Sequence, residues 1–288
     1  MGREIVRKES PRKPGGRSRL WNNDDVIDVL AKITYPTKLK ELNLSYSEHL
    51  TCTPDFTGLL NLEKLILIGC KSLVEVHENI DRLKKLVWLD LSGCHSLKNL
   101  PSSLSKLPSL KILDISYCQE IGKLPMGMRK LISSNGLCFL KEVILKGCNL
   151  TDNDIPDEFW LLYSLKSLNL GKNYFESLPS SIGQLSQPQN LDVRDCKRLK
   201  SLPMLPSSLH SLDASFCFKL ERLPNLSKLK QLTMLHLSCC EKLTEIEGLE
   251  GLISAEGIQL DKCNNLKSFV EKRIFQVLSS LSLLGSVC

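Results

Sequence analysis

The sequence predicts an α/β solenoid. In this fold, short coils stack into a curved horseshoe with a parallel β-sheet on the concave side and irregular or 3₁₀ backbone on the convex side. Three observations predict it. In one recurring pattern, apolar residues stand at positions 1, 4 and 6 and a cysteine stands at position 9. The pattern occurs in ten copies, spaced mostly by 23 or 24 residues. Further leucines return in the second half of many copies, and prolines often follow them.

The apolar part of each copy predicts a short strand. The copies start at Leu39, Leu62, Leu86, Leu110, Leu140, Leu165, Pro188, Leu209, Leu232 and Ala255. Alternate leucines lie on one side of such a strand, and a single strand cannot bury them alone, so neighbouring copies must stack into a parallel sheet.

The second half of each copy predicts the convex side. Prolines follow the returning leucines at Pro101, Pro125, Pro179, Pro203 and Pro224. Because proline bars a regular helix or ladder, this side should be irregular or 3₁₀ and wider than the sheet side, which makes the stack curve.

A cysteine marks the point where the chain leaves each strand. Eight cysteines share this register: Cys70, Cys94, Cys118, Cys148, Cys196, Cys217, Cys240 and Cys263. Ser47 and Asn173 fill it in two other copies. Cysteine is small, is often buried and is a weak donor, so we expect buried thiols that contact backbone. No CxxC pair is present, which disfavours zinc. Free thiols fit a reducing compartment, so we expect a cytoplasmic, or else nuclear, protein.

Composition and charge exclude several classes. The chain has 288 residues, 42% hydrophobic and 24% charged, which is typical of a globular protein. Residues 1–20 carry seven basic and two acidic side chains within a net charge of +6. No aromatic residues interleave with this basic run, so a solvated linker is favoured over a nucleic-acid site. We therefore expect no nucleic-acid partner and no membrane partner.

Two stretches resemble one family. "LVWLDLSGCHSLKNLPSSLSKLPSLKILDISYC" (86–118) has the Leu-Asp-Leu-Ser-x-Cys and Leu-Pro-x-x-Leu pattern of leucine-rich repeats in plant disease resistance proteins of the TIR-type nucleotide-binding (NB-ARC) class. "MGREIVRKESPRKPGGRSRLWNNDDVIDVL" (1–30) is similar to the winged-helix end of that family's nucleotide-binding module. The resemblance implies a module remnant and connection at 1–38, a leucine-rich repeat domain at 39–270, and a cap or non-family tail at 271–288.

The resemblance also implies a function. The repeats would act as the sensor and autoinhibitory region of an intracellular immune receptor. The protein partner would be a pathogen effector, a guarded host protein or the receptor's own nucleotide-binding module. ATP or ADP would bind the family's upstream module. Because the GxxxxGK[ST] loop and the Met-His-Asp motif of that module are absent from the sequence, we expect no cofactor here.

Candidate binding residues are the variable strand positions on the concave face. They include three aromatic anchors, a lysine step, and aspartates that stack beside an arginine. The candidates are Trp88, Asp90, Lys111, Asp114, Tyr117, Lys141, Lys166, Lys172, Asp192, Arg194, Asp213, Phe216 and His236. The alternative interpretation is an ordinary solvated face with cross-strand charge compensation.

Other functions remain as alternatives. The five histidines are scattered, so we expect no enzyme. A stand-alone intracellular scaffold of the Ras-type repeat class is the second functional hypothesis. The fourth copy is 30 residues long, and its excess at Gly127–Phe139 predicts a loop that either binds a partner or is merely tolerated.

Overall fold

The computed structural model describes residues 19–20, 38–122, 124 and 139–266. The chain forms two compact units, Met1–Ile144 and Leu145–Cys288. Most of the predicted module remnant and all of the predicted tail at 271–288 lie outside the described residues. Of the predicted loop at Gly127–Phe139, only Phe139 is described, and its side chain is exposed.

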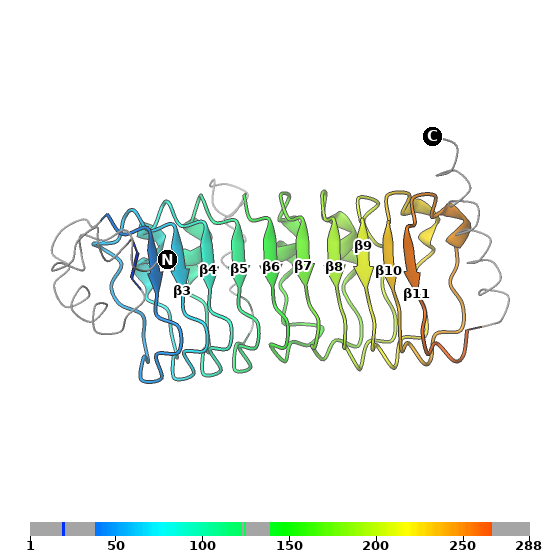
Figure 1. Cartoon of the computed structure of the whole chain (residues 1–288), viewed down its shortest axis with the longest axis horizontal. Helices are drawn as coiled ribbons and strands as arrows, with labels where there is room; N and C mark the ends of the chain where they lie inside the picture. Colours follow the sequence, from blue (N-terminus) through cyan, green and yellow to red (C-terminus); the bar gives the residue numbers. More distant parts are fainter. Residues whose placement is uncertain (1–18, 21–37, 123, 125–138, 267–288) are drawn as a thin grey trace, which may run out of the picture. The chain divides into compact units, whose positions relative to one another are not determined.

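The first unit contains six parallel strands that pair in chain order (Figure 1). The strands are β1 (Arg19–Leu20), β2 (Glu41–Asn43), β3 (Lys64–Ile66), β4 (Trp88–Asp90), β5 (Ile112–Asp114) and β6 (Glu142–Ile144). Their register matches the repeat alignment, with Leu65 opposite Leu89 and Leu89 opposite Leu113. β1 was not predicted, because it lies before the first copy of the repeat.

The second unit contains five parallel strands, again paired in chain order. They are β7 (Ser167–Asn169), β8 (Asn190–Asp192), β9 (Ser211–Asp213), β10 (Met234–His236) and β11 (Gly257–Gln259). In both units the middle residue of nearly every repeat strand is buried and its neighbours face outward, as the spacing predicts. Each unit is thus a leucine-rich repeat solenoid.

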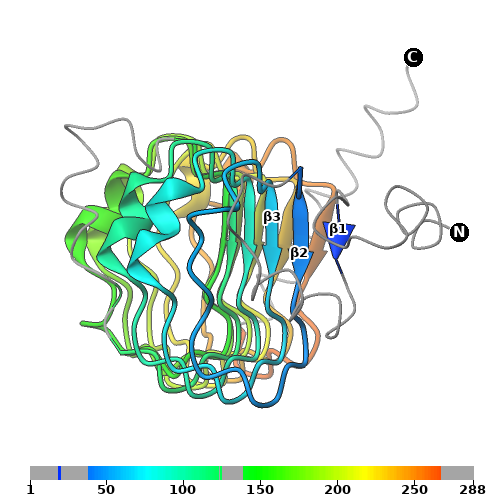
Figure 2. The same cartoon turned by 90° about the vertical axis from the view of Figure 1, so that its left-hand side faces the viewer.

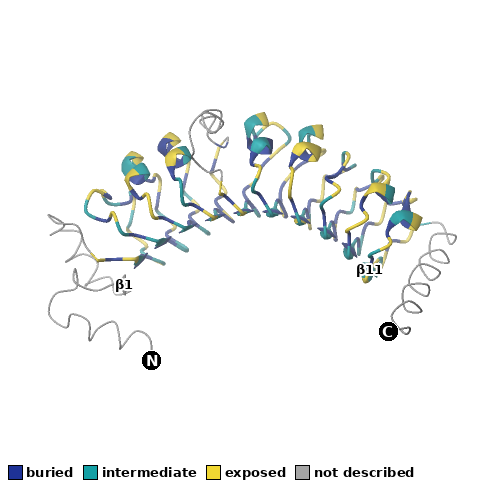
Figure 3. Ribbon diagram, turned by 90° about the horizontal axis from the view of Figure 1, so that it is seen from above, coloured by how far each residue is buried: buried dark blue, intermediate teal, exposed yellow. Residues whose placement is uncertain are grey.

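The core of each unit lies between the strands and the outer turns (Figure 3). Leucines of the strand pattern, such as Leu89, Leu91 and Leu212, have no exposed surface. Leucines of the returning half, such as Leu97 and Leu220, are equally buried. Because every coil buries both sets against its neighbours, the leucine period positions the strands.

Short 3₁₀ helices lie on the side opposite the sheet (Figure 2). They are η2 (Glu78–Arg82), η3 (Ser102–Lys106), η5 (Asp157–Leu161), η6 (Ser180–Gln184), η7 (Leu226–Lys228) and η8 (Leu249–Gly251). Pro101, Pro156 and Pro179 directly precede three of them. The predicted 3₁₀ side is therefore confirmed in the described coils, and proline sets where the turn begins.

Near these prolines the described backbone forms isolated bridges and no regular ladder, as predicted. Isolated parallel bridges join Cys52, Glu75 and Asn99 in the first unit. A second set joins Ser177, Ser201 and Arg222 in the second unit. Four of these bridge residues, Asn99, Ser177, Ser201 and Arg222, lie just before a leucine–proline pair, where the backbone still has its N–H groups.

The cysteine register is confirmed as a buried ladder. The Sγ of Cys94 donates to the carbonyl of Leu67 at 3.2 Å, and that of Cys217 donates to Val193 at 3.2 Å. Cys70, Cys118, Cys196, Cys240 and Cys263 make the same contact one coil back. Burial raises the pKa of the Cys196 thiol to about 12, so it keeps the proton that this bond needs at neutral pH.

Asn173 takes the cysteine position in one coil and makes more bonds than a thiol can. Its side chain is 1% exposed. Its Nδ2 donates to the carbonyls of Leu145 and Leu170 at 2.9 and 2.8 Å. Its Oδ1 accepts from the N–H groups of Cys148 and Leu150 at 3.0 and 3.1 Å. The amide thus fixes two neighbouring coils.

Candidate functional site

The outward side of the sheet, here called the strand face, carries the variable residues. Each repeat presents an outward residue between its second and third core positions. In six repeats this residue is Asp or Asn, and its Oδ1 accepts the N–H two residues later at 2.8–3.0 Å. The six are Asn43, Asp90, Asp114, Asn169, Asp192 and Asp213. The column therefore closes the turn that ends each of these strands.

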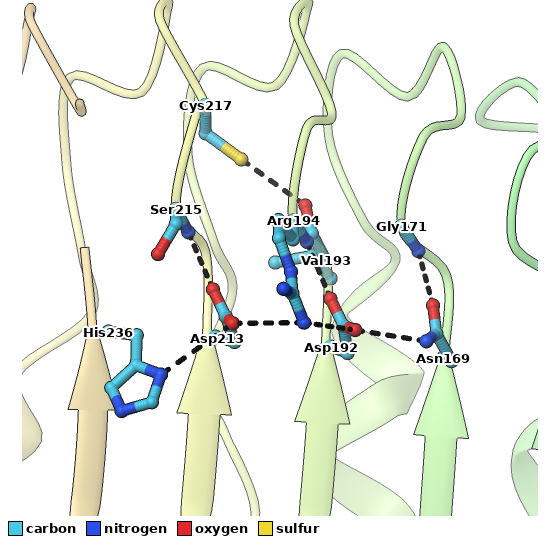
Figure 4. Close-up of polar contacts among 9 residues, drawn as sticks. All are labelled: Asn169, Gly171, Asp192, Val193, Arg194, Asp213, Ser215, Cys217 and His236. Atoms are coloured by element: carbon cyan, nitrogen blue, oxygen red, sulfur yellow. Dashed lines mark hydrogen bonds and ion pairs between the residues drawn. The ribbon is translucent and has the colours of Figure 1, made fainter. Parts of the chain in front are cut away.

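In the second unit, part of this column joins into a polar chain across four strands (Figure 4). Asn169 on β7 donates from Nδ2 to Asp192 Oδ2 at 2.9 Å. The guanidinium of Arg194 lies 3.2 Å from Asp192 Oδ2 and 3.3 Å from Asp213 Oδ2. One arginine thus bridges the carboxylates of β8 and β9.

His236 ends the polar chain on β10. Its Nδ1 lies 3.6 Å from Asp213 Oδ2, and its Nε2 is buried without a hydrogen-bond partner. Arg194 remains 49% exposed, whereas the side chains of Asp192 and Asp213 are 22% and 14% exposed. The arginine is therefore the member most accessible to a partner, and the carboxylates hold it in place.

In the first unit, Trp88 and two aspartates occupy the strand face. The Lys64 ammonium lies 5.2 Å from the centre of the Trp88 ring, a cation–π contact. Asp90 is 5% exposed and caps the turn through both the N–H and the hydroxyl of Ser92. Burial raises the pKa of the neighbouring Asp114 carboxyl, and its bonds to Ser116 offset part of that effect.

The three predicted aromatic anchors differ in their surroundings. Trp88 is half-buried, whereas its prediction as an anchor assumes an exposed ring, and its Nε1 is enclosed without a hydrogen-bond partner. Tyr117 and Phe216 are 37% and 43% exposed, and Phe216 contacts Phe218 edge-to-face at 6.4 Å.

The predicted lysines divide between the units. Lys111 and Lys141 precede β5 and β6 in the first unit, and both are exposed. Lys166 precedes β7 and Lys172 follows it in the second unit. Of the candidates, the structure brings together Asp192, Arg194, Asp213 and His236. The sequence analysis did not name Asn169 as a candidate, although Asn169 occupies the same position in its repeat as Asp192 and Asp213 do in theirs.

A hollow of about 380 Å³ lies on the flank of the first unit. Its lining includes Cys52, Glu75, His77 and Lys98, side chains of mixed charge. Within the described residues, no three His, Cys, Asp or Glu side chains are placed to hold a metal ion. Among the helices in the described parts of the chain, none has the length and apolar character needed to cross a membrane.

Comparisons with known proteins agree on one family. A profile described as "Disease resistance protein RPS4B-like, leucine-rich repeats" matches residues 34–231. TMV resistance protein N of Nicotiana glutinosa is 49% identical over 79 residues, which is 27% of this chain and 7% of that protein. Protein SUPPRESSOR OF npr1-1, CONSTITUTIVE 1 of Arabidopsis thaliana is 41% identical over 234 residues, which is 80% of this chain and 15% of that protein. This chain thus spans only a small part of these relatives.

A solved structure supports the fold independently. The leucine-rich repeat domain of the type III effector XCV3220 (XopL) superposes with a TM-score of 0.66. The alignment covers 90% of this chain and 88% of that one at 24% identity. At this identity the likeness establishes the architecture and carries no functional argument.

Proposed function

The chain belongs to the RPS4B-like family of plant disease resistance protein leucine-rich repeats, and on this premise we propose that its strand face recognises a protein. The partner would be a pathogen effector or a guarded host protein inside the plant cell. The same repeats would hold the receptor's nucleotide-binding module inactive until that partner binds. The family and the fold are typical of interaction scaffolds, which favours binding over catalysis.

The observation that supports this proposal most directly is the polar chain around Arg194. Leucines and thiols fix the coils from within, so the strand face is free to vary without loss of the fold. On that face Arg194 presents a half-exposed guanidinium that two carboxylates hold in place. A preorganised arginine can bind a carboxylate or a carbonyl of a partner with little loss of side-chain entropy, as interface hot spots do.

The test is a charge reversal with a matched control. We would express the tagged full chain in leaf tissue, with and without Arg194→Glu, and purify each form. The amounts of the proteins recovered with the variant would then be compared with those recovered with the unmodified chain. Lys197→Glu is the control, because Lys197 is 64% exposed and its ammonium lies 3.6 Å from a single carboxylate oxygen, Asp195 Oδ1. We expect the recovery of specific proteins to fall at least tenfold with Arg194→Glu and to stay unchanged with Lys197→Glu. Equal recovery with both variants would refute a role for this part of the strand face.

Autoinhibition needs its own measurement. The full chain would be co-expressed in leaves with the nucleotide-binding module of a related receptor that is active alone. We expect the chain to suppress the cell-death response of that module. Unchanged cell death at equal protein levels would contradict the autoinhibitory part of the proposal.

A further inference from the structure

Two aspartates of the first unit lie directly opposite each other on neighbouring strands. Asp90 on β4 pairs with Asp114 on β5 in the parallel register. The Oδ1 atom of each accepts the N–H and the hydroxyl of the serine two residues later. In the described part of the chain, no basic side chain forms an ion pair with either carboxylate. Like charges in this arrangement destabilise a sheet.

The turns that end these strands do not require the charges. Asn43 and Asn169 occupy the same position in two other repeats, and the Oδ1 of each accepts the N–H two residues later at 2.9 Å. An amide can therefore cap the turn and introduces no charge. Burial, together with the carboxylates of Asp90 and Glu142, raises the pKa of Asp114, so the fold disfavours its ionised form. Charges that the fold neither requires nor compensates indicate a role in function.

The second unit shows how such a pair is compensated. Asp192 on β8 and Asp213 on β9 are opposite each other in the same register. The guanidinium of Arg194 lies 3.2 Å from the Oδ2 of the first and 3.3 Å from the Oδ2 of the second (Figure 4). Arg194 follows Asp192 by two residues, and the residue that follows Asp90 by two is Ser92. The first unit thus has the pair of carboxylates and a serine in place of the arginine.

The oxygen atoms that Arg194 contacts in the second unit have no partner in the first. Asp90 is only 5% exposed, so an unpaired oxygen there is unfavourable. Within the described residues, neither the Oδ2 of Asp90 nor that of Asp114 accepts a hydrogen bond. A bound guanidinium would satisfy both oxygens at once, because its N–H groups form a planar fork.

Apolar residues border the two aspartates. In the parallel register, Ile66 on β3 and Ile144 on β6 lie beside them. Trp88 and Ile112 precede them by two residues and therefore lie on the same side of the sheet. All four are half-buried. Such a border keeps water from an ion pair and strengthens the attraction between its charges.

The ionisable residues around the pair do not fill this role. On the outward positions of β3 to β6 the only cation is Lys64, which lies over the Trp88 ring. Residues of both signs flank these strands, and none of them pairs with Asp90, Asp114 or Glu142: Glu63, Lys111 and Lys141 before the strands, and Lys71, His95 and Glu120 in the turns after them. A cation that reaches the Oδ2 atoms must therefore come from a partner.

We propose that the Asp90–Asp114 pair binds an arginine side chain of a protein partner. The guanidinium lies between the two Oδ2 atoms, as that of Arg194 does in the second unit, and the apolar border contacts the residues beside the arginine. Lysine is a weaker ligand here, because a single ammonium lacks the planar fork that bridges two carboxylates. This inference rests on the proposed protein-recognition function and names the side chain that the first unit selects.

The test uses three synthetic peptides and the ¹⁵N-labelled full chain. The probe is Gly-Leu-Arg-Leu-Gly with blocked ends, and the controls replace arginine by citrulline, which has the same shape without the charge, or by lysine. The amides of Ser92 and Ser116 report on the site, because they donate to the two aspartates. We expect the probe to shift both in a saturable way, the lysine peptide to bind at least about threefold more weakly, and the citrulline peptide to cause no saturable shift.

Two outcomes of that titration would overturn the proposal. One is equal binding of the citrulline peptide and the probe. The other is a shift of the Ser215 amide as large as that of Ser92. Ser215 donates to Asp213, whose carboxylate Arg194 already holds, so its amide should not respond.

A matched pair of charge-removing variants separates binding from structure. Asp114→Asn keeps the cap and removes one charge of the pair. Asp81→Asn removes a charge on η2, on the side opposite the sheet, where Asp81 pairs with Lys106. We expect Asp114→Asn to weaken probe binding at least about fivefold without lowering the urea midpoint, and Asp81→Asn to leave binding unchanged. Equal binding by both variants, or a lower midpoint in Asp114→Asn, would refute the inference.

A second pair of variants fills the site from within. Ser92→Arg places an arginine where the second unit has Arg194, so it should compete with the probe and abolish the saturable shift of the Ser116 amide. Ser238→Arg makes the same change in the second unit, two residues after His236, and should leave that shift intact. Undiminished probe binding by Ser92→Arg would show that the arginine does not lie between these carboxylates. Failure of these tests with partner loss retained in Arg194→Glu would leave the proposed function standing, and failure of both would reject the two together.

Discussion

Replacing Asn173 by alanine should destabilise the second unit more than replacing any ladder cysteine. The Asn173 side chain is 1% exposed and bonds to two carbonyls and two N–H groups of neighbouring turns. Alanine leaves the N–H groups of Cys148 and Leu150 buried without this acceptor. It also removes the donor to the Leu145 carbonyl. A buried group left without its partner costs about 1–3 kcal/mol.

The magnitude follows from that count. Taking about 1–1.5 kcal/mol for each of three orphaned groups, near the lower end of the range, gives about 4 kcal/mol. Cys217→Ala orphans only the Val193 carbonyl and leaves a void of about one methyl group. We expect about 2 kcal/mol for that change. The two variants therefore differ by about 2 kcal/mol if the bonds carry the effect.

Hydrogen exchange resolves this difference locally. Repeat stacks can unfold in parts, so a single global midpoint is an incomplete measure. In Asn173→Ala, amides in segments 145–150 and 168–173 should lose up to about a thousandfold of protection, which corresponds to about 4 kcal/mol. Asn190→Ala is the control, because Asn190 is exposed on β8. It should change protection by less than about threefold.

The result that would refute this reasoning is equally specific. If Asn173→Ala and Cys217→Ala lower protection equally, the extra bonds of the amide contribute nothing. The cysteine register would then be a matter of size alone. Asn173→Ser offers a further check, because a hydroxyl restores one contact and should recover only part of the loss.

Three further predictions concern charges and thiols. Burial raises the pKa of Asp114, so the ionised carboxylate is disfavoured in the folded state. Asp114→Asn keeps the cap of the turn and should raise the urea midpoint at pH 7. This gain in stability should disappear as the pH falls below about 4. Hydrogen bonds from the Thr57 hydroxyl and amide and from Asn79 lower the pKa of Asp55 to about 2. The stability that these bonds contribute above pH 4 should therefore be lost as the pH falls toward 2. In Asp55→Asn the thermal midpoint should fall less over this pH range. Iodoacetamide at pH 8, followed by peptide mass spectrometry, should modify the half-exposed Cys239 well before Cys196 and Cys217, because burial raises the pKa of both ladder thiols; equal rates would contradict the buried ladder.

The features that sequence reasoning predicted are those that one repeat determines alone. Leucine spacing gives the strand and its buried side, and the cysteine register gives the thiol ladder. The features it missed depend on the next coil. Lys64 of the preceding strand lies over the Trp88 ring, and Asn169 joins Asp192 through the parallel register. The pairing of β1 was missed because Arg19–Leu20 lies outside the repeat pattern.

The division between frame and surface explains where specificity can reside in this fold. The strand-end aspartates Asp192 and Asp213 are less free to contact a partner, because each already accepts the N–H two residues later and Arg194 holds both carboxylates. The residue just before the cysteine register keeps a left-handed backbone in all ten repeats, and in this row the chain places Gly, Tyr, Lys, Asp, Phe or Cys. A position whose backbone is constant while its side chain varies can change partner preference without changing the coil. We therefore expect partner-altering substitutions to concentrate in that row and at Arg194, more than at Asp192 and Asp213.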